Sequence, residues 1–546
     1  MHTLLRIALP LPVEKLGGGL IMSGWIKTLS LNTLSQKQRT VFRFEGKQIA
    51  LFLTKTGVLA CNNRCPHEGY PLREGTLDDA CVLTCHWHNW KFDLTSGANL
   101  FGGDRLRIYP TDVRAGEIWL DLSEPSFEAR QSELMANLRQ AFDDNDYERI
   151  ARELARIQLL GADPAAAIIA AINWSYDRLE FGWTHAYAGA ADWLALYDEY
   201  NDPEIQLICV LETIAHIADD VVREAVYSYS ENSLPYAEDG FAQAIETENE
   251  TTAIALLRGA LNEGLHFTDL EPALTQAALK HYNDFGHSLI YLTKAGYLIE
   301  RLGTAVELPL LLSLVRNLIY ATREDQIPEF RGYQEALKQW GKNDKTTAPT
   351  ALDYQGLTID KALQLTAYHS KASHDSLYAA LLGANAANML RYDMRYQNHI
   401  DRPVSDNVGW LSFTHGITFA NAVRLQCEKF PELWPAGLLQ MACFSGRNTP
   451  FTDRGLKSEQ WQVSDSDAFF KNSLDALFDH GKEEFIVSVH LLKTLLAART
   501  ETRQAAVTDV AVAIPAAVNR FLHSPLKRKH VRRTARQAMA FVAKDR

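Results

Sequence analysis

A chain of 546 residues is too long for a single hydrophobic core, because single cores stop growing at roughly 250–300 residues, so we expect at least two domains. Apolar residues make up 47% of the chain and charged residues 22%, a composition that excludes wholesale disorder. The net charge of −12 excludes general nucleic-acid binding, because that activity needs a basic surface to displace counterions from phosphates.

The cysteines and the apolar runs indicate the compartment. Seven cysteines are spread unevenly along the chain, which is not the pattern of a disulfide framework and favours a reducing cytoplasm. Residues 1–23 form an N-terminal extension whose apolar stretch is broken by prolines and lacks the usual small-residue cleavage site, so we expect no signal peptide. No apolar run reaches the roughly 18 residues that a membrane helix needs, so we expect no membrane span.

Residues 24–125 form the first predicted domain. Short segments rich in β-branched and aromatic residues alternate there with turn signals. The expected strands are Thr40–Phe44, Ile49–Thr54, Val82–Cys85, Lys91–Leu94 and Ile118–Leu122. This pattern predicts a small all-β domain.

Two Cys/His pairs in this domain have the spacing of metal ligands. One residue separates Cys65 from His67, seventeen residues follow, and two residues then separate Cys85 from His88. Thiolates suit the iron of a cluster that stays ferric, and neutral imidazoles on the second iron raise the reduction potential. Zinc sites use the same ligand types, but here each half contributes one Cys and one His instead of a matched pair. The motif therefore predicts a [2Fe–2S] cluster.

About 100 residues around this motif resemble the Rieske family, through the turn CPHEG, the segment FDLTSG and Trp87 between the second Cys and His. The resemblance implies a [2Fe–2S] cluster held by Cys65, His67, Cys85 and His88. Respiratory-type members carry a disulfide at the places that Tyr70 and Trp87 occupy here, so the sequence is similar to the soluble ferredoxin and oxygenase branch. Asn89 replaces the usual glycine after the last ligand histidine, and we expect it to displace the backbone there.

Residues 126–546 form the second predicted domain. Apolar residues recur there at intervals of three and four, which predicts an all-helical domain, and breakers such as Pro203, Gly303 and Pro450 divide it into many helices. Eight Lys or Arg residues against one Asp follow Pro525 in a helical pattern. This basic C-terminal helix could dock an acidic partner or could simply be solvated.

Four segments of the helical domain form an internal repeat. They begin at Thr184, Gly286, Thr414 and Val489, and each places a histidine near the start of an apolar helix. The histidines are His185, His287, His415 and His490. A single histidine in an apolar helix is most often a hydrogen-bonded core residue, but four at equivalent helix positions could converge on one interior point. We expect a mononuclear non-haem Fe(II) there, because neutral imidazoles bind Fe(II) and open coordination positions admit O2.

Three further residues are catalytic candidates. Glu212 and His216 are four residues apart and therefore share one face of a helix. Lys493 lies one turn after the last of the four histidines. Its side chain could simply snorkel, could donate a proton or, if carboxylated, could act as an anionic ligand.

The segments FTHGITFANAVR, SVHLLK and LETIAHIA resemble the questin oxidase-like family of all-helical oxygenases. That resemblance implies an O2-dependent oxidation of an aromatic or quinone-like substrate. A conventional Rieske oxygenase instead carries an α/β catalytic domain with a 2-His-1-carboxylate iron. We find no such signature, and too few strand-like segments follow Phe127 to build its sheet.

We therefore expect a cytoplasmic Rieske-fused non-haem iron oxygenase that acts on an aromatic or quinone-like small molecule. No dinucleotide-binding fingerprint occurs, so its electrons would come from an external NAD(P)H-dependent reductase or ferredoxin. The cluster and the iron would have to approach closely, within one chain or across the interface of a homo-oligomer. The alternative is a non-enzymatic electron carrier or redox sensor whose helical domain binds a partner. The two differ in whether the protein holds iron beyond the two atoms of the cluster.

Overall fold

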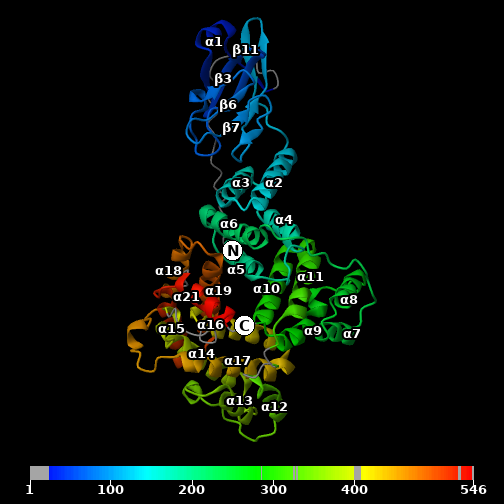
Figure 1. Ribbon diagram of the computed structural model, residues 1–546, viewed down its shortest axis with the longest axis vertical. Coiled ribbons are helices and arrows are strands. Elements are labelled where there is room, and N and C mark those ends of the chain that lie inside the picture. The colour runs from blue at the N-terminus through cyan, green and yellow to red at the C-terminus, as the bar shows by residue number, and fades with distance from the viewer. Residues whose placement is uncertain are drawn as a thin grey trace, which may run out of the picture. The chain divides into compact units, whose positions relative to one another are not determined.

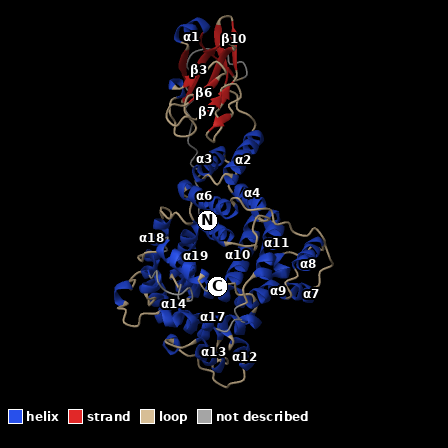
Figure 2. Cartoon of the chain, viewed as in Figure 1, coloured by secondary structure: helices blue, strands red, loops and turns tan. Residues whose placement is uncertain are grey.

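The computed structural model describes residues 24–283, 286–323, 326, 330–398, 408–526 and 531–543. The chain divides into two compact units, Met1–Ala141 and Phe142–Arg546. The strands belong to the first unit and the second is helical, as Figures 1 and 2 show. The predicted fold class, a small all-β domain followed by a large all-α domain, is confirmed. The predicted N-terminal extension, residues 1–23, lies outside the described residues.

The first unit contains three antiparallel sheets, with strand orders β1-β11-β10, β2-β3-β4-β9 and β5-β6-β7-β8. Its elements are β1 (Trp25–Ser30), α1 (Leu31–Lys37), β2 (Arg39–Phe44), β3 (Lys47–Thr54), β4 (Gly57–Asn62), η1 (Leu72–Glu74), β5 (Thr76–Leu77), β6 (Val82–Thr84), β7 (Lys91–Asp93), β8 (Asn99–Phe101), β9 (Ile108–Tyr109), β10 (Thr111–Arg114) and β11 (Glu117–Asp121).

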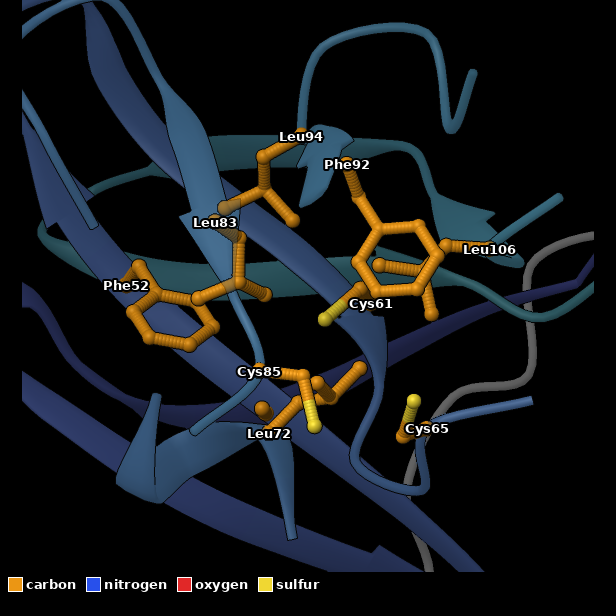
Figure 3. Packing of buried hydrophobic residues seen from close by; sticks show 10 residues of the cluster. Phe52, Cys61, Cys65, Leu72, Leu83, Cys85, Phe92, Leu94 and Leu106 are labelled. Atoms are coloured by element: carbon orange, nitrogen blue, oxygen red, sulfur yellow. The ribbon is translucent and has the colours of Figure 1, made fainter. Parts of the chain in front are cut away.

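Strand β3 separates two hydrophobic cores, because successive side chains of a strand point to opposite faces. Ile49 and Leu51 pack into the core that also contains Ile118 of β11. Ala50 and Phe52 pack into the other core, which Figure 3 shows. The second core extends to the two loops that carry the predicted cluster ligands.

These two loops have the same backbone design. The Cys65 N–H donates to the Tyr70 carbonyl at 2.9 Å, and the Cys85 N–H donates to the Trp90 carbonyl at 2.8 Å. The residue before each of these carbonyls has a left-handed φ, +76° at Gly69 and, at the equivalent place in the second loop, +60° at an asparagine.

Our expectation that Asn89 displaces the backbone is wrong. Its φ of +60° and the closing hydrogen bond of its loop match those of the first loop. Asparagine tolerates the left-handed region better than other residues that carry a Cβ, because its short polar side chain bonds locally. The two ligand loops are therefore held alike.

The second unit begins within α2. Its helices are bounded as follows: α2 (Phe127–Asp143), α3 (Tyr147–Leu160), α4 (Ala165–Ser175), α5 (His185–Glu199), α6 (Pro203–Val221), α7 (Glu238–Glu246), α8 (Glu250–Asn262), α9 (Phe267–Lys280), α10 (His287–Leu302), α11 (Thr304–Tyr320), α12 (Tyr333–Gln339), η4 (Ala351–Tyr354), α13 (Ile359–Tyr368), α14 (His374–Leu390), α15 (Met394–Asn398), α16 (Trp410–Lys429), η6 (Pro431–Leu433), α17 (Trp434–Asn448), η7 (Thr449–Phe451), η8 (Glu459–Trp461), α18 (Ser466–Leu477), α19 (Phe485–Gln504), α20 (Thr508–Leu522) and α21 (Val531–Val542).

Local signals in the sequence explain where several of these helices begin and end. The Asp202 carboxylate accepts the first main-chain N–H groups of α6, and Pro203 occupies its first turn, where a missing N–H costs nothing. Gly303, with φ +78°, ends α10. The Thr184 hydroxyl accepts from the Ala186 N–H and so caps α5.

Four helices at the centre of the second unit form a closed ring. Helix α5 packs on α10, α10 on α16, α16 on α19, and α19 back on α5. Helices α16 and α19 are buried around most of their circumference over their first halves, as expected for helices that other helices surround. This ring carries all four histidines of the predicted repeat.

In the described part of the chain no strand follows Asp121. The sheet of a conventional Rieske oxygenase catalytic domain is thus not found among these residues. The same residues contain no helix with both the length and the apolar character needed to cross a membrane.

We predict that Asn89→Ala destabilises the second ligand loop by about 1 kcal/mol, because alanine lacks the side-chain bonding that offsets a left-handed φ. Asn89→Gly should leave the loop as stable as the native one. Hydrogen exchange of segment 82–93 would measure this locally. Equal protection in the alanine and glycine variants would contradict the prediction.

Candidate metal centres

The first candidate site lies at the ends of the two ligand loops. We call its four side chains the loop quartet: Cys65, His67, Cys85 and His88. Both cysteines are buried at one end of the second core, and Figure 3 shows their side chains there. The ring centres of the two histidines are 4.7 Å apart with the planes at 74°. Each loop therefore brings one thiol and one imidazole to the same place.

One ring nitrogen of the loop quartet has no hydrogen bond among the described residues to satisfy it. The Nδ1 of His67 is buried without a hydrogen-bond partner in the described structure. Burial, and then the neighbouring Cys85, raise the pKa of the Cys65 thiol to about 12. Two buried thiols side by side become thiolates only beside a cation, so the donor set fits an iron–sulfur cluster.

Aromatic rings fix the two imidazoles. Trp90 stacks on His67 with ring centres 4.6 Å apart and planes at 9°, and Trp87 stacks on His88 at 5.7 Å and 12°. Trp87 itself is 58% exposed, and His88 is also exposed. His88 is therefore exposed, His67 is half-buried, and both cysteines are buried.

The second candidate site lies inside the four-helix ring of the second unit. We call its members the helix quartet: His185, His287, His415 and His490. One nitrogen of each lies within 4.8 Å of the others. Ring contacts run in the same order as the helices, with successive ring centres 4.8, 4.4, 5.3 and 4.9 Å apart around the closed circuit. The sequence repeat had predicted all four positions, and the structure brings them together.

Main-chain carbonyls fix the tautomer of three of these histidines. The Nδ1 of His287 is 2.8 Å from the carbonyl four residues earlier, and the corresponding distances at His415 and His490 are both 2.6 Å. A carbonyl oxygen can only accept, so Nδ1 carries the proton and Nε2 presents a lone pair. His185 begins its helix and has no such carbonyl; the Tyr291 hydroxyl lies 3.4 Å from its Nδ1 instead.

The Nε2 atoms then face one another. His287 Nε2 is 3.1 Å from His185 Nε2 and 2.9 Å from His415 Nε2. Burial, and then the charge of Lys493, lower the pKa of His185 and His415 well below the ordinary value, so a proton does not join them. Two nitrogens that bind one cation at about 2.1 Å and at right angles are ~3 Å apart, which matches these distances. The set therefore fits a metal ion.

His490 completes the site. Burial lowers its pKa well below the ordinary value, and its Nε2 has no hydrogen-bond partner among the residues described. A buried nitrogen lone pair without a donor is unfavourable. A cation bound between the four rings would remove that defect.

The prediction that the four histidines occupy equivalent helix positions is wrong. His185 and His287 are the first residues of α5 and α10, whereas His415 and His490 are the sixth residues of α16 and α19. Thr184 caps its helix, but its repeat partner Thr414 lies inside one. The sequence pattern marks the histidine and the apolar run after it, and it does not mark where each helix begins.

Lys493, which the sequence named, lies beside the helix quartet. It is buried, its Nζ is 3.1 Å from His415 Nε2, and burial lowers its pKa to about 7. The charge of Asp192 opposes this shift, and the Asp192 Oδ1 accepts from Lys294 Nζ at 2.5 Å. Sequence reasoning missed Asp192 and Lys294. Each lies seven residues after a quartet histidine and thus on the same helix face, which was the available signal.

Glu212 and His216, the other two candidates, lie one turn apart on α6 but outside the helix quartet. The Glu212 carboxylate accepts from the Tyr147 hydroxyl at 2.9 Å and from His480 Nε2 at 3.1 Å. His216 stacks on Phe485 with ring centres 5.0 Å apart. The shared helix face was foreseen, but the partners of the two side chains were not.

Comparison with known proteins identifies the first unit. Residues 24–103 match the family described as the Rieske [2Fe-2S] domain. The 3-phenylpropionate/cinnamic acid dioxygenase ferredoxin subunit of Escherichia coli (strain K12) is 37% identical over 78 residues, which are 14% of this chain and 74% of that protein. The same subunit of Shigella boydii serotype 4 (strain Sb227) is 36% identical over a segment of equal length.

Among solved structures, the ferredoxin of carbazole 1,9a-dioxygenase from Nocardioides aromaticivorans IC177 is 24% identical. The match covers 18% of this chain and 100% of that chain, with a TM-score of 0.18. The family match and the identity to the dioxygenase ferredoxin subunits agree with the two Cys/His loops described above. Through its first unit this chain belongs to the Rieske [2Fe–2S] domain family, and the cluster that such a domain implies makes it an electron-transfer protein.

Proposed function

We propose that this protein is a Rieske-fused non-haem iron oxygenase. In this proposal the loop quartet holds the [2Fe–2S] cluster and the helix quartet holds a mononuclear iron. When bound, the two groups would supply electrons and O2 activation for the oxidation of an aromatic or quinone-like small molecule. The observation that supports it most is the closed circuit of four imidazoles, three of them buried, in which one nitrogen of each faces the others.

Redox-active iron suits the helix quartet better than zinc does. Imidazole ligands accept iron, copper, nickel and zinc alike, so the ligand type does not decide. The same chain carries a Rieske domain, and iron, unlike zinc, could accept the electrons that its cluster would supply. The curated relatives are ferredoxin subunits of a dioxygenase that is named for two aromatic acids. This similarity supports an aromatic substrate, and electrons from an external NAD(P)H-dependent reductase or ferredoxin.

Lys493 is the residue that we propose to act beside the iron. Its Nζ lies 3.1 Å from His415 Nε2, a ring nitrogen of the helix quartet. A lysine with a pKa of about 7 can hold or release a proton at Nζ near neutral pH. A carboxylated Lys493 would instead be an anionic ligand of the iron. The two roles differ in whether the protein still binds this iron when Lys493 is replaced.

A non-enzymatic electron carrier is the second candidate. The specific observation in its favour is that the relatives are ferredoxin subunits. Under this alternative the helical unit would bind a partner, and the helix quartet would hold no iron. The iron content of the protein separates the two.

We predict close to three irons per chain in anaerobically purified protein, two in the cluster and one in the helix quartet. His185→Ala and His415→Ala should each reduce the count to two, because each removes a nitrogen that faces the centre. The visible spectrum of the cluster should not change in either variant. His523→Ala, which alters an exposed histidine elsewhere in the unit, should keep three. Two irons in all four proteins would support the electron carrier.

We predict that Gly189→Ala weakens iron binding about tenfold although all four ligands remain. A Cβ on Gly189 would lie 2.7 Å from Val489 Cγ2, so α5 and α19 would have to separate, and such overpacking typically costs about 1–3 kcal/mol. Adding Val489→Ala should restore binding. Competition with a chelator would measure the affinity.

Gly240→Ala is the matched control for this experiment. It also adds a methyl group to a helix, but the nearest atoms would lie at an ordinary 3.7 Å. Iron affinity should therefore equal that of the native protein. Equal affinities of the Gly189→Ala and Gly240→Ala proteins would show that the spacing of α5 and α19 does not matter to the centre.

We predict that Lys493→Met keeps three irons but lowers O2 consumption about 100-fold, the usual contribution of a general acid. The rate would be measured with NADH and a ferredoxin reductase, and the rate of the His415→Ala protein would be subtracted as background. Lys471→Met, which removes an exposed lysine, is the control and should retain the native rate. Loss of the third iron in Lys493→Met would identify Lys493 as a ligand, against the proton-donor role.

A further inference from the structure

A cavity of about 560 Å³ lies in the helical unit, outside both candidate metal centres. Residues from α6, from the turn before α3 and from the segment that joins α18 to α19 line it. Its volume falls in the ordinary range for small-molecule sites, which is roughly 300–1,000 Å³. Neither proposed metal centre accounts for it.

The polar group of this cavity is the carboxylate of Glu212. Its side chain is only 4% exposed, and it accepts from the Tyr147 hydroxyl at 2.9 Å and from His480 Nε2 at 3.1 Å. The Lys482 N–H donates to His480 Nδ1 at 2.9 Å, so Nε2 of that neutral imidazole carries the proton that Glu212 accepts. A carboxylate has about four acceptor positions, and two remain for a donor from a ligand.

The walls of the cavity are aromatic and its charge is negative. Tyr147, Phe478 and Phe485 supply rings, which favour a flat aromatic ligand. The charged lining comprises the buried Glu212 carboxylate with Asp479, Glu483 and Lys482. Three acidic groups against one basic group disfavour a ligand that carries a carboxylate. A neutral aromatic molecule with a hydroxyl donor meets all of these conditions.

The cavity also borders the framework of the helix quartet. Phe485 begins α19, and its ring stacks on His216 at 5.0 Å with the planes at 11°. The Nδ1 of His216 lies beside Gly189, since a Cβ built there would be 3.7 Å from it, and Gly189 is one turn after His185. The stacked pair of Phe485 and His216 therefore connects the lining of the cavity to α5, the helix that carries His185.

We propose that this cavity binds a neutral hydroxylated aromatic molecule whose hydroxyl group donates to Glu212. Only the further step, that this molecule is the substrate class of the oxygenase, rests on the function proposed above. Binding itself needs no metal. Glu212 thereby becomes a ligand-binding residue, and His216 a positioning residue between the ligand and the metal centre.

The test is calorimetric titration of the full-length protein with 1-naphthol as the probe. Glu212→Gln keeps the shape of the side chain but removes the charge, and a hydrogen bond to a charged group contributes about 1.5–3 kcal/mol. Binding should therefore weaken at least tenfold. Thr251→Ala, at a different cavity of the same unit, should bind as the native protein does. Unchanged binding in Glu212→Gln would overturn the proposal.

Two further probes test the ligand class. 1-Naphthoate and 1-naphthylmethylamine have the same ring system and should both bind more weakly than 1-naphthol. The negative lining repels the naphthoate anion, and the ammonium group would lose its hydration beside a carboxylate that Tyr147 and His480 already satisfy in part. Tighter binding of the amine would show that the carboxylate pairs with a cation, and tighter binding of naphthoate would show that the negative lining is not decisive. Either result would overturn the proposed class.

A measurement on the native protein covers the case in which Glu212→Gln does not fold. Saturating 1-naphthol should slow hydrogen exchange in segments 208–216 and 478–485, which line the cavity. No change in those segments would overturn the proposal.

The His415→Ala protein separates this inference from the proposed function. It should lack the third iron and still bind 1-naphthol with native affinity. Three irons in the native protein without naphthol binding would leave the oxygenase proposal standing and refute the cavity. Naphthol binding in a native protein with only two irons would support the cavity and refute the oxygenase proposal.

Discussion

Four imidazole rings meet inside the helical unit with one nitrogen of each within 4.8 Å of the others. The lone pairs of His287 Nε2 and His415 Nε2 meet at 2.9 Å, which is unfavourable unless positive charge lies between them. The residues next to each histidine in the sequence do not by themselves produce this arrangement. Three of the rings are held by their Nδ1–H bonds to helix carbonyls, and the ring of α5, α10, α16 and α19 holds the helices. Burial keeps the rings neutral. The packing of these four helices therefore brings one nitrogen of each histidine to a single point.

Main-chain hydrogen bonds help to place the Cys and His residues in both units, but the backbone conformation differs between them. In the Rieske unit, each ligand loop is closed by a main-chain hydrogen bond from its cysteine and by one left-handed residue. In the helical unit, the backbone orients the ligands through the carbonyl one turn earlier. Main-chain hydrogen bonds therefore fix the loop backbone in the Rieske unit and the donor nitrogen of three histidines in the helical unit. Side-chain packing adds to this in the Rieske unit, where Trp90 stacks on His67.

Charged side chains lie beside the helix quartet and further along its helices. The quartet itself supplies neutral nitrogens, Lys493 lies beside it, and Asp192 with Lys294 lies two turns away. Neutral ligands leave the charge of a bound metal uncompensated, and in a buried site such charge is costly. The carboxylate of Asp192, whose charge acts on Lys493, would therefore help to balance the charge of a metal bound there. The separate carboxylate of Glu212 belongs to the cavity that Phe485 also lines, beside His216.

The sequence by itself determined the Rieske unit, because its predicted ligands are close together in the chain and their spacing alone indicates a [2Fe–2S] cluster. It also determined the helical class of the remainder and named all four histidines, since each precedes an apolar run that a reader can recognise. Only the tertiary structure decided that those histidines meet, that two begin their helices while two lie further in, and that Glu212 and His216 belong to a different place. The physical reason is the separation of the residues along the chain. Cluster loops are local, whereas residues 185, 287, 415 and 490 become neighbours only when four distant helices close into a ring.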